Sequence, residues 1–126
     1  MIDDAPVELV AYDPNWPAAF EAELELIRQV AGEWLLGPIE HVGSTAVPGL
    51  PAKPVIDIMA AVRDLVVSRP AIAALATIDY CYAPYQADRM HCSANLTRLR
   101  APTICTLFPY TPRCGARSLR SAIICE

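Results

Sequence analysis

The sequence has no apolar run of the roughly 18 residues that a membrane-spanning helix needs, because proline, aspartate or arginine interrupts each candidate. It also has no excess of basic residues. The net charge is −4 and the isoelectric point is near 5.1, which disfavours a broad grip on a nucleic-acid backbone. The acidic start Met1–Asp4 lacks the basic-then-apolar order of a signal peptide. We therefore expect a cytoplasmic protein, and 126 residues that are 54% hydrophobic predict one folded domain.

Acidic residues and cysteines are distributed unevenly on the two sides of residue 91. Residues 1–91 hold 13 acidic and 5 basic side chains, whereas residues 92–126 hold one acidic and 5 basic ones. Four of the five cysteines also follow residue 91. They form no C-x2-C pair and no histidine lies among them, which argues against zinc, and a cytoplasmic location argues against disulfides. Composition therefore separates residues 1–91 from an atypical tail.

Hydrophobic spacing predicts the elements of the first part of the chain. Phe20, Leu24, Ile27, Ala31 and Leu35 fall on one stripe, which predicts an amphipathic helix of about five turns that ends at Gly37-Pro38. A nearly continuous apolar run predicts a strand over residues 55–62 that is covered on both faces. Shorter segments predict strands over residues 39–42 and 80–82, and a second helix whose main segment begins near residue 70.

Asp57 is the most informative residue, because it interrupts this apolar strand. A buried carboxylate is costly unless it is paired, hydrogen-bonded or bound to a cation. Strand alternation places it on one face with Val55, Met59 and Ala61. Asp57 either faces a functional site on that side or accepts hydrogen bonds from backbone amides of the preceding proline-rich loop.

Gly43-Ser44-Thr45 forms a second candidate feature. Glycine lets backbone amides approach a phosphate closely, and the two hydroxyls can donate to its oxygens, although an ordinary turn has the same composition. Lys53, the only lysine of the chain, lies between this turn and Asp57. It can neutralise a phosphate, pair with the carboxylate or remain solvated.

Glu40 and His41 precede the turn on opposite faces of the predicted strand. Glu40 shares a face with Val42 and Ser44, so it can point toward the same site. His41 has two interpretations, a structural histidine or a catalytic one, and the structural one is the more common.

Taken together, Gly43-Ser44, twelve intervening residues and Asp57 in an apolar strand resemble the signature of the nucleotidyltransferase superfamily. More specifically, the segments Glu40–Leu50 and Ala52–Ile58 resemble the GrpB family, and the resemblance runs from about residue 7 to residue 91. It implies an α/β fold, a mixed sheet flanked by helices. It also implies a Gly43-Ser44-Thr45 turn that holds nucleotide phosphates with Lys53, and acids, Asp57 and Glu40, that serve catalysis. Asp57 would hold Mg²⁺, with a nucleoside triphosphate as substrate.

Two features depart from these patterns. The superfamily metal pair is acid-x-acid, whereas Asp57-Ile58-Met59 supplies one acid, and a thioether is a poor ligand for Mg²⁺. Some GrpB proteins are fused to dephospho-CoA kinase, but this chain has no Gly-x4-Gly-Lys-Ser/Thr loop, so no kinase activity is implied.

The tail, residues 92–126, does not continue with the His-His-Leu-His strand and the helix that are typical of the family. Regrouping the codons of residues 100–107 by one base, with C at most third positions, produces Arg-Thr-His-His-Leu-His-Leu. We therefore hypothesise a single-base slip near residue 91, which the nucleotide sequence after that codon tests. A slipped tail predicts a truncated fold with little regular structure over residues 92–126.

Three hypotheses for function follow. The first is a nucleotidyltransferase-like enzyme that acts on an unidentified, small acceptor. The second is a non-catalytic nucleotide-binding or regulatory module, which the single acid of the strand favours. The third is an inactive, truncated product. The sequence does not specify the acceptor, the nucleotide base or the oligomeric state.

Overall fold

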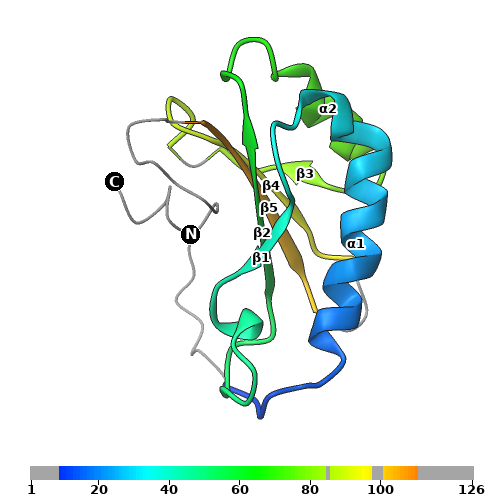
Figure 1. The fold of residues 1–126 in the computed structure, drawn as a ribbon, viewed down its shortest axis with the longest axis vertical. Helices are drawn as coiled ribbons and strands as arrows, with labels where there is room; N and C mark the ends of the chain where they lie inside the picture. The colour runs from blue at the N-terminus through cyan, green and yellow to red at the C-terminus, as the bar shows by residue number, and fades with distance from the viewer. Residues whose placement is uncertain (1–8, 85, 98–100, 111–126) are drawn as a thin grey trace.

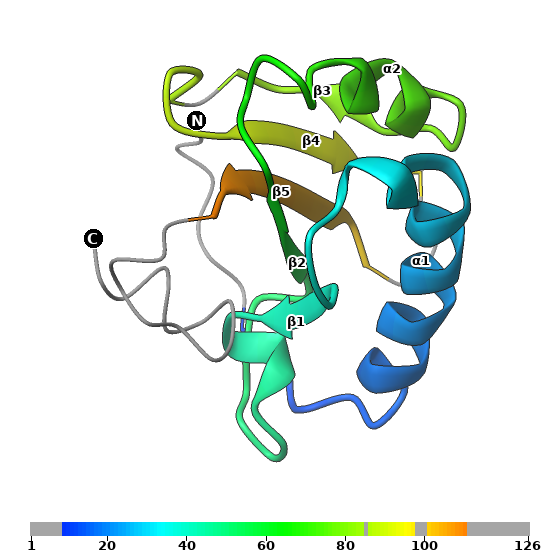
Figure 2. The ribbon, with the colours of Figure 1, turned by 45° about the horizontal axis from the view of Figure 1, so that its top comes forward.

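The computed structural model describes residues 9–84, 86–97 and 101–110. These residues form a five-stranded sheet with both α-helices on one side of it (Figure 1, Figure 2). In chain order the elements are α1 (Trp16–Ala31), the 3₁₀ turn η1 (Gly32–Trp34), β1 (Glu40–Val42), the 3₁₀ turn η2 (Ser44–Ala46), β2 (Ile56–Val62), α2 (Pro70–Ala76), β3 (Cys81–Tyr82), β4 (His91–Asn95) and β5 (Thr103–Pro109).

The sheet is mixed, with the strand order β1-β2-β5-β4-β3. β2 and β5 are parallel, and the other three pairs are antiparallel. The last strand of the described residues therefore lies at the centre of the sheet. This architecture confirms the predicted α/β class with a mixed sheet.

Helix α1 carries the predicted apolar stripe but ends earlier than predicted. Phe20, Leu24, Ile27 and Ala31 are all buried beneath it. The prediction that the helix reaches Gly37 is wrong, because the chain tightens into η1 at Gly32, a residue with low helix propensity. The predicted fifth member of the stripe instead leaves the helix and forms an isolated bridge to β2.

Strand β2 has one fully buried face and one half-buried face. Ile56, Ile58 and Val62 are at most 1% exposed and belong to the main core with α1 and α2. Asp57 and Met59 alternate with them and remain partly exposed. The prediction that this strand is covered on both faces holds at its end, where Ala60, Ala61 and Val62 are all buried, but not at Asp57 and Met59. Among the described elements, α1 and α2 lie on the same side of the sheet (Figure 1). We call the side away from the helices the open face.

The tail contains two regular strands, so the expectation of little regular structure over residues 92–126 is wrong for residues 92–97 and 101–110. β5 alternates buried Thr103, Cys105 and Leu107 toward the helices, and β4 pairs with it over five residues. β-branched and apolar side chains at every second position are sufficient to form a strand there. Residues 103–109 also supply the central strand of the sheet, β5. Residues 98–100 and 111–126 lie outside the described residues.

None of the helices in the described part of the chain is long and apolar enough to cross a membrane.

Candidate functional site on the open face of the sheet

The candidate site is built around Asp57, the second residue of β2. Its direct neighbours in the sheet are Val42 of β1 and Ile104 of β5. Because paired residues of adjacent strands present their side chains to the same face, these two apolar residues flank the carboxylate on the open face. The carboxylate is therefore held by a rigid sheet at a position that water reaches only in part.

Gly43 lies directly against the Asp57 carboxylate. Its φ of +80° is the left-handed conformation that favours glycine, and a Cβ atom built on it would lie 2.6 Å from Oδ2 of Asp57. A side chain at residue 43 would therefore clash with the carboxylate and strain the backbone. The structure thus brings together the glycine turn and the acid that the sequence separates by thirteen residues.

Two opposing influences act on the carboxyl of Asp57. Burial is the main influence and raises the pKa of this carboxyl above its ordinary value, while the positive charge of Lys53 acts in the opposite direction. No hydrogen bond or salt bridge joins the carboxylate to another residue within the described ranges. The alternative in which backbone amides of the proline-rich loop satisfy this acid therefore has no support in the described residues.

Glu40 is the second acid on the open face. It pairs with Met59, two positions from the Val42–Asp57 pair, so it is the diagonal neighbour of Asp57. Cβ atoms in such diagonal positions lie roughly 7–8 Å apart, within reach of a long side chain. The structure confirms that Glu40 and Asp57 share a face. Whether they act in catalysis stays a prediction.

Asp57 and Glu40 suit a Mg²⁺ ion that also has non-protein ligands better than they suit a metal ion whose ligands all come from the protein. Mg²⁺ takes oxygen ligands and is usually held by one or two carboxylates together with substrate phosphates and water. No cluster of three or more His, Cys, Asp or Glu side chains with metal-binding geometry occurs among the residues that the structure describes. The donor set therefore suits a cation that arrives with a phosphorylated ligand.

Ser44 and Lys53 are both exposed, on the two chain segments that flank Asp57. Ser44 opens η2 directly after Gly43, and its side chain is accessible to a ligand. Lys53 lies four residues before Asp57 and its charge reaches the carboxylate. Both side chains are placed where the predicted contacts with phosphate are sterically available.

Thr45 does not fit its predicted role as a phosphate ligand. Its side chain is 1% exposed, and its hydroxyl donates to the backbone oxygen of Val55 at 2.9 Å. Nε2 of His41 lies 2.9 Å from the same hydroxyl, and the imidazole stacks on Phe20 with the ring centroids 5.1 Å apart. The hydroxyl of Thr45 is therefore committed to the protein interior, and His41 has the structural environment that its sequence context favoured.

Cys92 and Thr106 are neighbours of the site that the sequence did not identify. They pair with each other across β4 and β5, and Thr106 also pairs with Met59 of β2. Burial raises the pKa of the Cys92 thiol, a hydrogen bond with Thr106 lowers it, and the charge of Asp57 raises it. Only the alternation within the tail could have indicated this placement, because the pairing of β4 with β5 and of β5 with β2 is not encoded locally.

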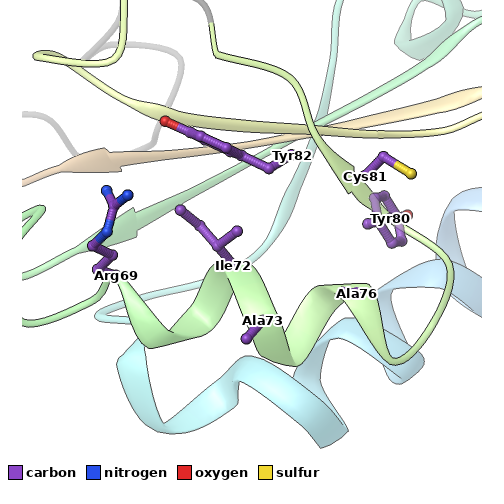
Figure 3. Close-up of a pocket in the computed structure, with 7 residues that line it drawn as sticks. All are labelled: Arg69, Ile72, Ala73, Ala76, Tyr80, Cys81 and Tyr82. Carbon is purple, nitrogen blue, oxygen red and sulfur yellow. The ribbon is translucent and has the colours of Figure 1, made fainter.

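Two surface hollows lined by described residues lie elsewhere. One, of about 470 Å³, lies between α2 and β3 and is lined by residues that include Arg69, Ile72 and Tyr82 (Figure 3). The other, of about 480 Å³, lies at the start of α1 around Tyr12 and Pro54. Neither is lined by Asp57, so the candidate site is distinct from both hollows.

Comparison with known proteins identifies relatives of this arrangement. The sequence model described as GrpB protein matches residues 6–116, so the similarity continues past residue 91 and includes β4 and β5. A UPF0157 protein of Halalkalibacterium halodurans is 52% identical over 61 residues, which cover 48% of this chain and 31% of the relative. A UPF0157 protein of Pseudomonas aeruginosa is 58% identical over 57 residues, which cover 45% of this chain and 23% of the relative.

A solved structure shares the fold. The crystal structure of the conserved protein GrpB from Enterococcus faecalis matches with a TM-score of 0.73 and 25% sequence identity, over 84% of this chain and 64% of that one. The chain thus spans less than a third of the two curated relatives and less than two thirds of the solved protein.

Proposed function

We propose, for a chain that belongs to the GrpB family, that the open face of the sheet binds a nucleoside triphosphate together with Mg²⁺ and transfers its nucleotidyl group to a small acceptor. We place this activity in the cytoplasm. The excess of acidic residues in the part of the chain that carries the site disfavours a nucleic-acid acceptor.

One observation carries the proposal: the backbone of Gly43 lies against the carboxylate of Asp57, with only 2.6 Å between Oδ2 and the place of a Cβ atom. The Gly43-Ser44 turn, which can approach a phosphate, therefore lies next to Asp57, which can hold a cation. Glycine is the residue that allows both the positive φ and this close approach.

Each residue has a chemical role in this proposal. The hydroxyl of Ser44 donates to a phosphate oxygen, and the ammonium of Lys53 offsets part of the negative charge of the phosphates. Asp57, assisted by Glu40, holds the cation through carboxylate oxygens. When bound, Mg²⁺ supplies charge neutralisation at the phosphate oxygens during transfer. Thr45 has no direct role, because its hydroxyl is already engaged.

A second candidate function is a nucleotide-binding module without catalysis. Met59 occupies the second acid position of the superfamily pattern, directly opposite Glu40. A site with fewer acids holds a cation more weakly, so phosphate binding through Ser44 and Lys53 could persist without metal.

Calorimetric titration of the protein with each of the four ribonucleoside triphosphates, in Mg²⁺ and again in EDTA, tests the proposal. We expect binding that needs Mg²⁺ and is lost in Asp57→Asn, while Asp88→Asn, which changes an exposed acid away from these strands, binds normally. Release of pyrophosphate with a suitable acceptor would identify the enzyme. Binding that is equal in EDTA and insensitive to Asp57→Asn would favour the module, and no binding of any nucleotide would contradict both.

A further inference from the structure

The turn that carries Gly43 is fixed by a chain of side-chain contacts on the helix-covered side of the sheet. His41 on β1 contacts Thr45 in η2, and Thr45 contacts the backbone of Val55 just before β2. Gly43 lies between the first two of these residues in the sequence, and Asp57 lies two residues beyond the third. The contacts therefore join the turn to the strand that bears the acid.

The direction of these hydrogen bonds follows from proton counting. The single hydroxyl hydrogen of Thr45 is donated to the carbonyl of Val55 at 2.9 Å. The same oxygen must then accept from its other partner, so Nε2 of His41 carries a hydrogen and donates it, also at 2.9 Å. Thr45 thus bridges a donor on β1 and an acceptor before β2.

The histidine is itself held in place by α1. Its ring lies nearly parallel to that of Phe20, at an angle of 18° and a centroid distance of 5.1 Å. Phe20 is buried in the main core, so the position of the imidazole depends on the most rigid part of the molecule. The side chains of His41 and Thr45 therefore link the core to the residue just before the start of β2.

We propose that Thr45 and His41 are positioning residues that hold the Gly43-Ser44 turn against Asp57, and so set the geometry in which phosphate and cation bind together. This inference rests on the proposed function of the site. It assigns a role to Thr45, whose buried and engaged hydroxyl does not suit direct contact with a ligand, and to its partner His41. Outer contacts of this kind typically change metal affinity or activity by roughly 10–100-fold when they are removed.

Thr45→Val tests the inference, because valine keeps the shape of threonine and removes the hydroxyl. We expect the backbone amide signals of Gly43 and Ser44 to shift in NMR spectra of the ligand-free protein, and the affinity for ATP with Mg²⁺ to fall about tenfold or more. Thr45→Ser keeps the hydroxyl and should retain both the signals and the affinity. His41→Leu should resemble Thr45→Val, whereas His41→Gln keeps a donor and should recover much of the affinity.

Tyr80→Phe is the control for a general loss of stability. It removes another buried hydrogen bond, the 2.8 Å contact from Tyr80 to Glu23, which lies between α1 and the segment before β3. We expect it to lower stability and leave the Gly43 signals and the nucleotide affinity unchanged.

The two readouts separate the two claims. If the unsubstituted protein binds ATP with Mg²⁺ and Thr45→Val binds it equally well, the positioning role is wrong and the proposed function stands. If the unsubstituted protein binds no nucleotide, the proposed function is wrong. Amide signals that do not move in Thr45→Val would by themselves overturn the positioning role.

Discussion

The two faces of β2 show how one strand serves both packing and chemistry. On the helix-covered face, Ile56, Ile58 and Val62 are at most 1% exposed and belong to the main core with residues of α1 and α2. On the open face, Asp57 and Met59 are only partly buried. A charge would be prohibitive on the first face and is tolerated on the second. A shift of one residue in the sequence therefore decides whether a carboxylate would be buried in the core or can remain partly exposed on the open face.

The most severe test of this comparison moves an acid from one face to the other. Ile58→Asp would bury an unpaired charge in the main core, and we expect a loss of several kcal/mol, comparable to the whole stability of a small domain. Circular dichroism should show no cooperative thermal transition. A cooperative transition like that of the unsubstituted protein would contradict the burial of this face.

Met59→Asp is the matched change on the open face. It restores the acid-x-acid pattern beside Glu40, and we expect a loss of only about 1–2 kcal/mol, since its side chain is partly exposed. Affinity for Mg²⁺ should rise, because a second carboxylate on β2 is added to the same face. Calorimetric titration with Mg²⁺ and ATP measures this affinity. Weaker Mg²⁺ binding than in the unsubstituted protein would argue against a metal site on the open face.

Gly43→Ala sharpens the comparison at the contact between turn and strand. The backbone of Gly43, with a φ of +80° and a ψ of −171°, is in a region that costs a non-glycine residue roughly 1–3 kcal/mol, and the contact with Asp57 Oδ2 adds to this cost. In an Asp57→Ala background the contact is absent, so the same substitution should cost only the backbone part. Urea unfolding of the four proteins of this cycle yields the coupling, and strictly additive effects would show that the two residues do not touch.

Asp57→Asn changes the pH dependence of stability. Because burial raises the pKa of this carboxyl in the folded protein, its contribution to stability is fully present below its ordinary pKa of 3.8 and is lost as the pH rises through the raised value. The asparagine variant lacks this loss. Its advantage in unfolding free energy should therefore be absent in acid and grow toward neutral pH, as denaturant titrations at several pH values can measure. An advantage that is constant with pH would contradict the shift.

Cysteine alkylation gives the gentlest test. Complete burial raises the pKa of Cys105, on the helix-covered face, to about 12, whereas Cys92 on the open face is half-buried and Cys81 is exposed. With iodoacetamide at pH 8, peptide mapping should find that, among these three cysteines, Cys81 reacts first and Cys105 last. Early modification of Cys105 in the folded protein would contradict the packing beneath α1.

Local patterns predicted the elements but not their long-range pairing. The stripe from Phe20 to Ala31 and the proline at residue 70 correctly marked both helices, because periodicity and proline act over a few residues. The alternation around Asp57 correctly placed it on one face with Met59, whereas its contact with Gly43 was implied only by the resemblance to the nucleotidyltransferase superfamily. The helices on a single side and the insertion of β5 beside β2 depend on contacts between segments more than forty residues apart, which no local pattern specifies.

Residues 92–126 show that composition, too, is a poor guide to structure. Their scarcity of acids and their scattered cysteines suggested a segment without structure, yet Thr103 to Leu107 satisfy the simple requirement of alternating burial. Composition describes solubility and charge, whereas strand formation depends on the order of side chains. The hypothesis of a base slip concerns the origin of this segment and stays a prediction for the nucleotide sequence.

The central position of β5 has a consequence for synthesis on the ribosome. β2 and β4 cannot be joined until residues 103–109 have emerged, because the strand that separates them is made after both. Until then each of the two strands presents unpaired backbone groups on the side that β5 will fill, and such edges can pair with those of other chains. The newborn polypeptide is thus vulnerable to aggregation until β5 emerges, and a holding chaperone that covers these strand edges should improve the yield.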